Sequence, residues 1–259
     1  MVCMAIFHPD SAHAVSESGS ANATNDAKRH FPVEQIAAFA RKIEGYFTDN
    51  NVMVALVARK GRPQSEMPEG MSFTHVGFAI RSNLLPDAKS ATSYTMYNAY
   101  QKDEKPDVSE LVTDTPESFF AKVFQLEAGI LIPSAEMQER LLEVIQSPVY
   151  RQLHDPHYSV IANPYSLGRQ NCTEFVLDVL TAARYQVQDQ EKIKAIEHKE
   201  FTAQKVNVNP AKLVFAALFK DEVSLCDHQF LPVTATFETI VKYMQHHDPE
   251  CATAVLTAE

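Results

Sequence analysis

An unbroken aliphatic segment restricts the fold of this chain more than any other feature. Residues 52–58 read Val-Met-Val-Ala-Leu-Val-Ala, and Lys60-Gly61-Arg62-Pro63 closes the run. A strand with one face in water alternates apolar and polar side chains, whereas a strand covered on both faces shows no polar position. The segment therefore predicts a strand that is buried on both faces.

The remaining segments predict a mixed fold. Apolar residues at helical spacing indicate a helix over residues 32–47, and alternating or aromatic-rich runs indicate strands over 73–81, 94–100 and 123–132. The strand over 94–100 should run antiparallel to the one before it. We expect an α+β domain with its helices on one side of an antiparallel sheet. Other expected elements are helices near 188–198, 210–219 and 236–246, a solvated loop over 102–117 and a short strand near 222–225.

The folded domain is expected to span residues 31–248. Residues 15–30 contain almost nothing to bury, so residues 1–30 are interpreted as a flexible leader. Residues 1–7 are apolar and residues 11–14 resemble a signal-peptidase site, but no basic segment precedes them. A remnant of a signal peptide is therefore the alternative interpretation. Residues 249–259 are interpreted as a C-terminal tail.

Charge and motif content exclude several classes of function. The net charge of −10 argues against nucleic acid as a partner, since phosphate binding needs a clustered basic surface. The chain has no apolar run long enough to span a membrane. Its four cysteines lack metal-ligand or disulfide-framework spacing, and it has no HExxH motif or glycine-rich phosphate loop. We expect no metal, no cofactor and no transmembrane segment.

Cys172 is the strongest candidate for a catalytic residue. It follows Asn171, a good helix cap, and precedes an apolar stripe over residues 175–183, which places it in the first turn of a helix. A helix start lowers the pKa of a thiol, and its backbone N–H groups can hold an oxyanion. Cys172 is therefore predicted to be a nucleophile. The alternative is a small buried apolar side chain.

A thiol nucleophile needs a base held close to it, and His75 is the best candidate among the ten histidines. It lies inside the expected strand 73–81, and Gly77 leaves room for the end of a helix to approach. Asn98, a polar residue in the aromatic strand 94–100, is the preferred residue to orient the imidazole. A structural histidine and an ordinary edge asparagine are the alternatives.

Two segments in this order resemble a known group of proteins. Phe73-Thr74-His75-Val76-Gly77-Phe78 precedes Gln170-Asn171-Cys172-Thr173-Glu174-Phe175-Val176 by about a hundred residues. A histidine strand before a cysteine helix resembles the circularly permuted branch of the papain-like superfamily, which includes permuted NlpC-type amidases and lecithin:retinol acyltransferase-like proteins. Over roughly residues 35–245 the chain is similar to the bacterial family catalogued as domain of unknown function 2145. That similarity also includes Val54-Ala55-Leu56-Val57-Ala58-Arg59, His157-Tyr158-Ser159 and Asn163-Pro164-Tyr165-Ser166.

The resemblance implies a circularly permuted papain-like fold in which the cysteine-bearing helix packs against an antiparallel sheet. It implies Cys172 as nucleophile, His75 as base and a polar third residue compatible with Asn98. Many family members carry signal peptides, so a periplasmic or secreted location is expected, with a cytoplasmic one as the alternative. The residues that the resemblance suggests as substrate contacts are Tyr158, its rival Tyr165, and Glu174.

These observations predict a cysteine-dependent hydrolase of an amide bond in a peptide or a cell-wall-type (peptidoglycan-type) substrate. An acyl or lipid transferase would use the same nucleophile but should need a wide apolar groove. A catalytically silent papain-like domain that binds peptide or glycan is the alternative of another class. The oligomeric state is left open by the sequence.

Overall fold

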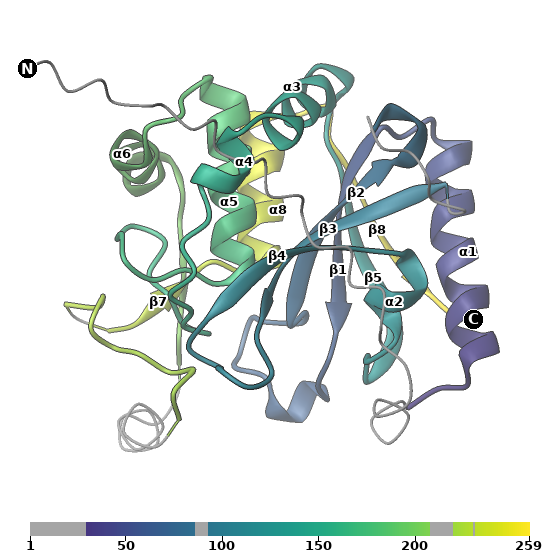
Figure 1. Ribbon diagram of the computed structural model, residues 1–259, viewed down its shortest axis with the longest axis horizontal. Coiled ribbons are helices and arrows are strands. Elements are labelled where there is room, and N and C mark those ends of the chain that lie inside the picture. The colour runs from purple at the N-terminus through teal and green to yellow at the C-terminus, as the bar shows by residue number, and fades with distance from the viewer. Residues whose placement is uncertain (1–29, 86–92, 208–219, 230) are drawn as a thin grey trace, which may run out of the picture.

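The computed structural model describes residues 30–85, 93–207, 220–229 and 231–259, and its centre is a six-stranded sheet (Figure 1). All neighbouring strands are antiparallel, in the order β4-β3-β2-β1-β5-β8. A separate pair joins β6 (Gln204–Lys205) to β7 (Val233–Thr234). The strands of the large sheet are β1 (Val54–Lys60), β2 (His75–Arg81), β3 (Tyr94–Gln101), β4 (Ser109–Asp114), β5 (Gln125–Ile132) and β8 (Ala252–Thr257).

Helices cover both faces of this sheet (Figure 1). One face carries α1 (Val33–Asp49) and α2 (Pro116–Phe120). The other carries α3 (Ala135–Gln146), α4 (Val149–Gln152), α5 (Cys172–Tyr185) and α8 (Phe237–His247), with α6 (Gln190–Glu200) packed on α5. The expectation that the helices lie on one side was wrong. Single 3₁₀ turns, η2 (Gln64–Glu66) and η3 (Ser82–Leu84), follow β1 and β2.

Strand β1 explains why both faces are covered. Val54, Leu56 and Ala58 point into the core below α5, whereas Ala55 and Val57 point into the core below α1. All five side chains are fully buried, which confirms the prediction from the aliphatic run. Burying both rows removes apolar surface from water on each side, and this requires a helical layer on each side.

The α+β class, the antiparallel pairing of β2 with β3, and most expected helices and strands are confirmed. Three local expectations differ from the structure. The segment 102–117 contains β4, residues 222–225 form no strand, and residues 252–257 of the expected tail form β8 at the sheet edge. The expected helix 210–219 and the leader up to residue 29 lie outside the described residues.

Within the described ranges, no helix combines the length and apolar character needed to cross a membrane. The same ranges contain no group of three or more histidine, cysteine or acidic side chains placed to hold a metal ion.

Candidate active site

The thiol of Cys172 lies at the first residue of α5, as predicted. Asn171 caps the helix, and its Oδ1 accepts hydrogen bonds from the backbone N–H groups of Thr173 and Glu174 at 3.0 and 2.9 Å. These two donors are therefore occupied by the cap. The N–H of Cys172 itself has no partner among the described residues, so it is the donor of this helix end that remains for a ligand.

Burial outweighs the helix end in setting the acidity of the thiol. Cys172 is 5% exposed, and this burial raises its pKa above the ordinary value. Hydrogen bonding from the Val76 backbone and from Thr173, together with the charge of Arg59, lowers the pKa by less. The expected lowering of the pKa by the helix start is thus reversed, because desolvation disfavours the thiolate.

His75 and Asn98 form the predicted pair. Nε2 of His75 lies 3.1 Å from Oδ1 of Asn98, which is 1% exposed on β3. Since an amide oxygen only accepts, Nε2 carries the proton and Nδ1 is the basic nitrogen. Nδ1 has no hydrogen-bond partner in the described part of the chain and is not among its fully buried unpartnered atoms, so it borders accessible space.

Gly77 makes room for this pair. A Cβ atom at Gly77 would lie 2.3 Å from Oδ1 of Asn98 and 2.8 Å from the carbonyl oxygen of Tyr97. A side chain at this position would displace Asn98 from His75. The room that Gly77 leaves is therefore filled by Asn98 of β3, and not by the end of a helix as expected from the sequence.

The thiol and the imidazole approach the same stretch of β2. The ladder between β2 and β3 ends at the pair Phe78 and Tyr97, so Val76 precedes it. The N–H of Ser82 donates to the carbonyl of Ser93 on the β3 side. Along a strand, every second N–H points to the same neighbour, so the N–H of Val76, six residues earlier, also points to the β3 side. That N–H has no strand partner and instead faces the Cys172 thiol.

The side chain of His75 lies on the face of the sheet that α1 and α2 cover. Its ring stacks on Tyr100, with ring centroids 4.8 Å apart, and lies 5.6 Å from Phe119 of α2. Cys172 belongs to α5, which packs on the other face. No hydrogen bond joins His75 to Cys172 within the described ranges. The two side chains thus lie on either side of the Val76 backbone, where β2 and β3 part.

The imidazole is held in its neutral form. Burial, followed by the positive charge of Arg59, lowers the pKa of His75 to about 3, although the hydrogen bond with Asn98 acts in the opposite direction. Arg59 is opposite His75 in the β1–β2 register. The neutral imidazole keeps a free lone pair, but a pKa this far below the ordinary value makes His75 a weaker base than a typical histidine in this state.

Acidification is expected to destabilise the fold through His75. Its pKa is about 3 in the folded protein against an ordinary 6.5, so the unfolded chain binds the extra proton between these values. The contribution of neutral His75 to the free energy of unfolding is intact above pH 6.5. It is lost as the pH falls toward 3, by at most about 1.4 kcal/mol per pH unit. Urea unfolding of His75→Gln should show a weaker pH dependence than wild type. The exposed control His157→Gln should keep the wild-type dependence, and an unchanged slope in His75→Gln would contradict the argument.

The suggested substrate contacts occupy three different environments. Tyr158 is 8% exposed, and burial followed by the charge of the nearby Cys172 raises its pKa, which places it in the neighbourhood of the thiol. The Tyr165 hydroxyl donates to the Phe201 carbonyl at 3.0 Å and accepts from the Ala203 N–H at 2.9 Å, which ties it to the segment after α6. Of these two tyrosines, Tyr158 is the one near the thiol.

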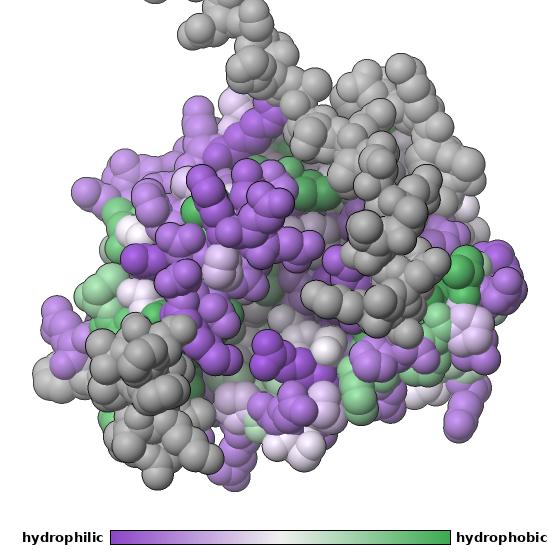
Figure 2. Space-filling model, turned by 60° about the horizontal axis from the view of Figure 1, so that its bottom comes forward, coloured by the Kyte–Doolittle hydropathy of each residue, from purple (hydrophilic) through white to green (hydrophobic). Residues whose placement is uncertain are grey.

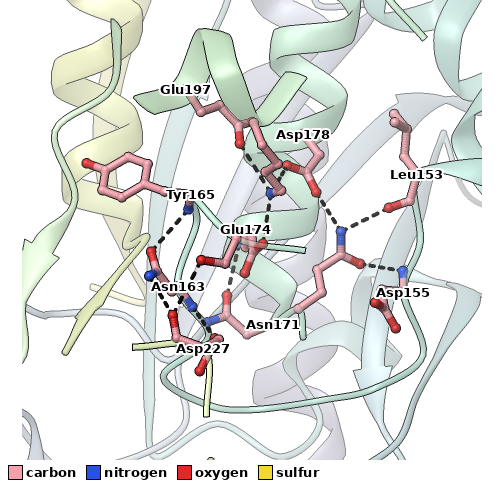
Figure 3. Close-up of polar contacts among 12 residues, drawn as sticks. Leu153, Asp155, Asn163, Tyr165, Asn171, Glu174, Asp178, Glu197 and Asp227 are labelled. Atoms are coloured by element: carbon pink, nitrogen blue, oxygen red, sulfur yellow. Dashed lines mark hydrogen bonds and ion pairs between the residues drawn. The ribbon is translucent and has the colours of Figure 1, made fainter. Parts of the chain in front are cut away.

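Glu174 belongs to a buried charge cluster between α5 and α6 (Figure 3). The ammonium of Lys194 contacts carboxylate oxygens of Glu174, Asp178 and Glu197 at 2.8, 2.6 and 3.2 Å. All four side chains are at most 9% exposed. The carboxylate of Glu174 is therefore engaged in joining α5 to α6.

Sequence reasoning missed Arg59, Tyr100 and Lys194. Tyr100 could have been found from strand periodicity, since it lies two residues after Asn98 on the same face, whereas the position of Arg59 near the end of β1 gave no such signal. Lys194 is four residues before His198 on a helix with few apolar residues, and no local pattern assigns it to the core.

The comparisons with known proteins identify a family. No curated protein and no solved structure matches the chain. Residues 47–244 match the profile of a family described as an uncharacterised protein conserved in bacteria, the domain of unknown function 2145. The match covers most of the chain and includes both Cys172 and His75. The chain therefore belongs to this bacterial family.

Proposed function

We propose that this protein is a cysteine-dependent hydrolase of an amide bond, with Cys172 as nucleophile, His75 as base and Asn98 as the residue that orients His75. The observation that carries the proposal is the 3.1 Å hydrogen bond from His75 Nε2 to Asn98 Oδ1 beside a thiol at a capped helix start. A Cys-His-Asn set is the catalytic arrangement of papain-like proteases. This chemistry also supports the permuted papain-like relationship.

In the proposed reaction, Nδ1 of His75 takes the proton of the Cys172 thiol as the sulfur attacks the carbonyl carbon. The C–S bond forms, the amide C–N bond breaks, and the amine leaves with the proton from His75. Water deprotonated by His75 then attacks the thioester, releasing the acid and restoring the thiol. The N–H groups of Val76 and Cys172 are the donors available to the oxyanion.

The resting pair is uncharged in this proposal. Burial raises the pKa of the thiol and lowers that of the imidazole, so His75 acts as a general base during attack and no thiolate–imidazolium pair is stored. Catalytic hydrogen bonds are often long without substrate and tighten in the complex. We place the closing of the Nδ1–Sγ contact at substrate binding.

The coloured part of the face in Figure 2 shows no broad apolar patch of the kind that an acyl chain would occupy. Figure 2 brings forward the lower end of the molecule, toward which β1 runs in Figure 1. Hydrophilic residues predominate on the part of this face that is coloured, and hydrophobic residues form small groups. An acyltransferase needs a broad apolar groove. A peptide or peptidoglycan-type amide, met in the periplasm or outside the cell, is the substrate class that we propose.

A catalytically silent binding domain is the second candidate. Two observations favour it: the raised pKa of Cys172, and the lack of a hydrogen bond between Cys172 and His75 among the described side chains. A buried protonated thiol behaves as a small apolar side chain. The region around Cys172 and His75 would then hold a ligand without cleaving it.

Hydrolysis assays with peptide and peptidoglycan-fragment amides, followed by mass spectrometry, should separate the two candidates. We expect Cys172→Ala to abolish cleavage and His75→Ala to reduce its rate by about 10²- to 10⁴-fold, because proton transfer is lost. Asn98→Ala should have a smaller effect, and the control Cys251→Ala none.

Two results would contradict the hydrolase. One is cleavage that survives in Cys172→Ala. The other is alkylation of Cys172 by a mild electrophile that is no faster than that of the exposed Cys226 at any pH and does not change in His75→Ala. The second result would favour the silent domain.

A further inference from the structure

Arg59 is a cation at the candidate site that has no role in the proposed reaction. It lies at the end of β1, directly opposite His75 in the ladder, and its neighbour Ala58 is opposite Val76. Its charge acts on both the Cys172 thiol and the His75 imidazole. In the part of the chain that the structure describes, no carboxylate lies within ion-pair distance of its guanidinium.

The guanidinium is held firmly but is only partly occupied. It lies 4.8 Å from the ring centroid of Phe119 and 5.3 Å from that of Tyr100, and Nη1 donates to the Phe119 carbonyl. The remaining nitrogens have no hydrogen-bond partner among the described residues and are not fully buried. Aromatic contacts fix the plane of a guanidinium and leave its edge for a planar anion.

The neighbouring groups do not neutralise this charge. His75 is uncharged, since its pKa is about 3. Burial raises the pKa of Asp114 and the charge of Arg59 lowers it, but among the described residues the two side chains form no ion pair. The whole chain carries a net charge of −10, which repels anions in general. Arg59, which lies beside His75 and acts electrostatically on the thiol, can therefore admit an anionic group at this place.

We propose that Arg59 binds a carboxylate of the substrate next to the scissile carbonyl. An arginine edge matches a carboxylate through two parallel N–H bonds, which fixes orientation as well as position. The substrates would then be amides in which a free carboxylate lies a few bonds from the cleaved bond, as in acidic peptides. This inference rests on the proposed hydrolase for the scissile bond, but the anion site can be tested without turnover.

The test compares two alkylating reagents of similar size, anionic iodoacetate and neutral iodoacetamide. In each the thiolate sulfur displaces iodide, forming a C–S bond as the C–I bond breaks. Rates at Cys172 are followed by peptide mass spectrometry, and the ratio of the two rates cancels changes in the reactivity of the thiol. We expect Arg59→Gln to lower the iodoacetate-to-iodoacetamide ratio about fivefold, and Arg59→Lys to retain most of it.

Two controls accompany the test. The substitution Arg41→Gln at an exposed residue of α1 should leave the iodoacetate-to-iodoacetamide ratio at Cys172 at its wild-type value. The ratio measured at the exposed Cys226 should be the same in every variant. In wild type the preference for iodoacetate should fall as salt is raised, which tests the charge even if Arg59→Gln does not fold.

An unchanged ratio in both Arg59 variants, or a wild-type ratio insensitive to salt, would overturn the inference. Failure of both reagents to modify Cys172 in the folded protein would overturn it too, because an anion site beside the thiol requires a reachable thiol. A lowered ratio without any amide hydrolysis would uphold the anion site and count against the hydrolase. Hydrolysis with an unchanged ratio would do the reverse.

Discussion

Replacing Lys194 with methionine is expected to reduce the free energy of unfolding at pH 8 by about 3–5 kcal/mol. The substitution preserves an unbranched apolar stem but removes the ammonium that contacts three carboxylates of α5 and α6 (Figure 3). Removing one partner of a buried ion cluster leaves charge that water cannot solvate. The loss therefore exceeds that expected for the packing change alone.

The charge balance of the cluster gives the prediction a pH dependence. With one ammonium for three carboxylates, burial raises the pKa of Glu174 and of Glu197 well above the ordinary value, and nearby Asp178 adds to this. Without Lys194 these pKa values should rise further. A group whose folded pKa is raised loses stability as the pH climbs above its unfolded value, so the variant should be impaired more at pH 8 than at pH 5.

Urea unfolding at these two pH values measures the effect. Lys192→Met, an exposed lysine on the same helix, should cost little. Adding Glu174→Gln and Glu197→Gln to Lys194→Met should restore part of the stability, because amides need no counter-charge. A Lys194→Met protein as stable as wild type at pH 8, or one more impaired at pH 5, would show that the cluster is not ionised as argued.

The central elements could be predicted because their signals are local. The aliphatic run of β1 and the stripe of α5 after the Asn171 cap each lie within a short window, and both are confirmed. The edge strands could not. In β4 the adjacent pair Leu111 and Val112 is flanked by polar and acidic residues without alternation, and in β8 alanine and threonine predominate. Pairing with β3 and β5, more than composition, makes these segments strands.

The residues of the candidate site could be selected from the sequence, but their surroundings could not. Strand alternation and helix capping led to Cys172, His75 and Asn98, and the hydrogen bond between the last two is present. The sign of the thiol pKa shift was missed, since it depends on burial by segments distant in the sequence. The contact of Arg59 with Phe119 of α2 spans 60 positions, and no local pattern announces it.

Gly77→Ala is expected to destabilise the protein by about 1–3 kcal/mol and to separate His75 from Asn98. The new methyl group would meet Oδ1 of Asn98 at 2.3 Å and the Tyr97 carbonyl oxygen at 2.8 Å. Asn98 can turn away only by giving up its hydrogen bond to Nε2 of His75. The Tyr97 oxygen belongs to the backbone of β3, so it can retreat only if the β2–β3 ladder opens.

Thermal or urea unfolding would measure the loss of stability, and the alkylation rate of Cys172 across pH would report the state of His75. Gly45→Ala on α1 is the matched control: no atom lies within 4 Å of its added Cβ, so the change should be neutral or stabilising by up to about 1 kcal/mol. Combining Gly77→Ala with Asn98→Ala should recover part of the stability, since the closest clash is removed, but not the reactivity of the thiol. Full stability in Gly77→Ala with wild-type reactivity would mean that Asn98 does not hold His75 through the space left by this glycine.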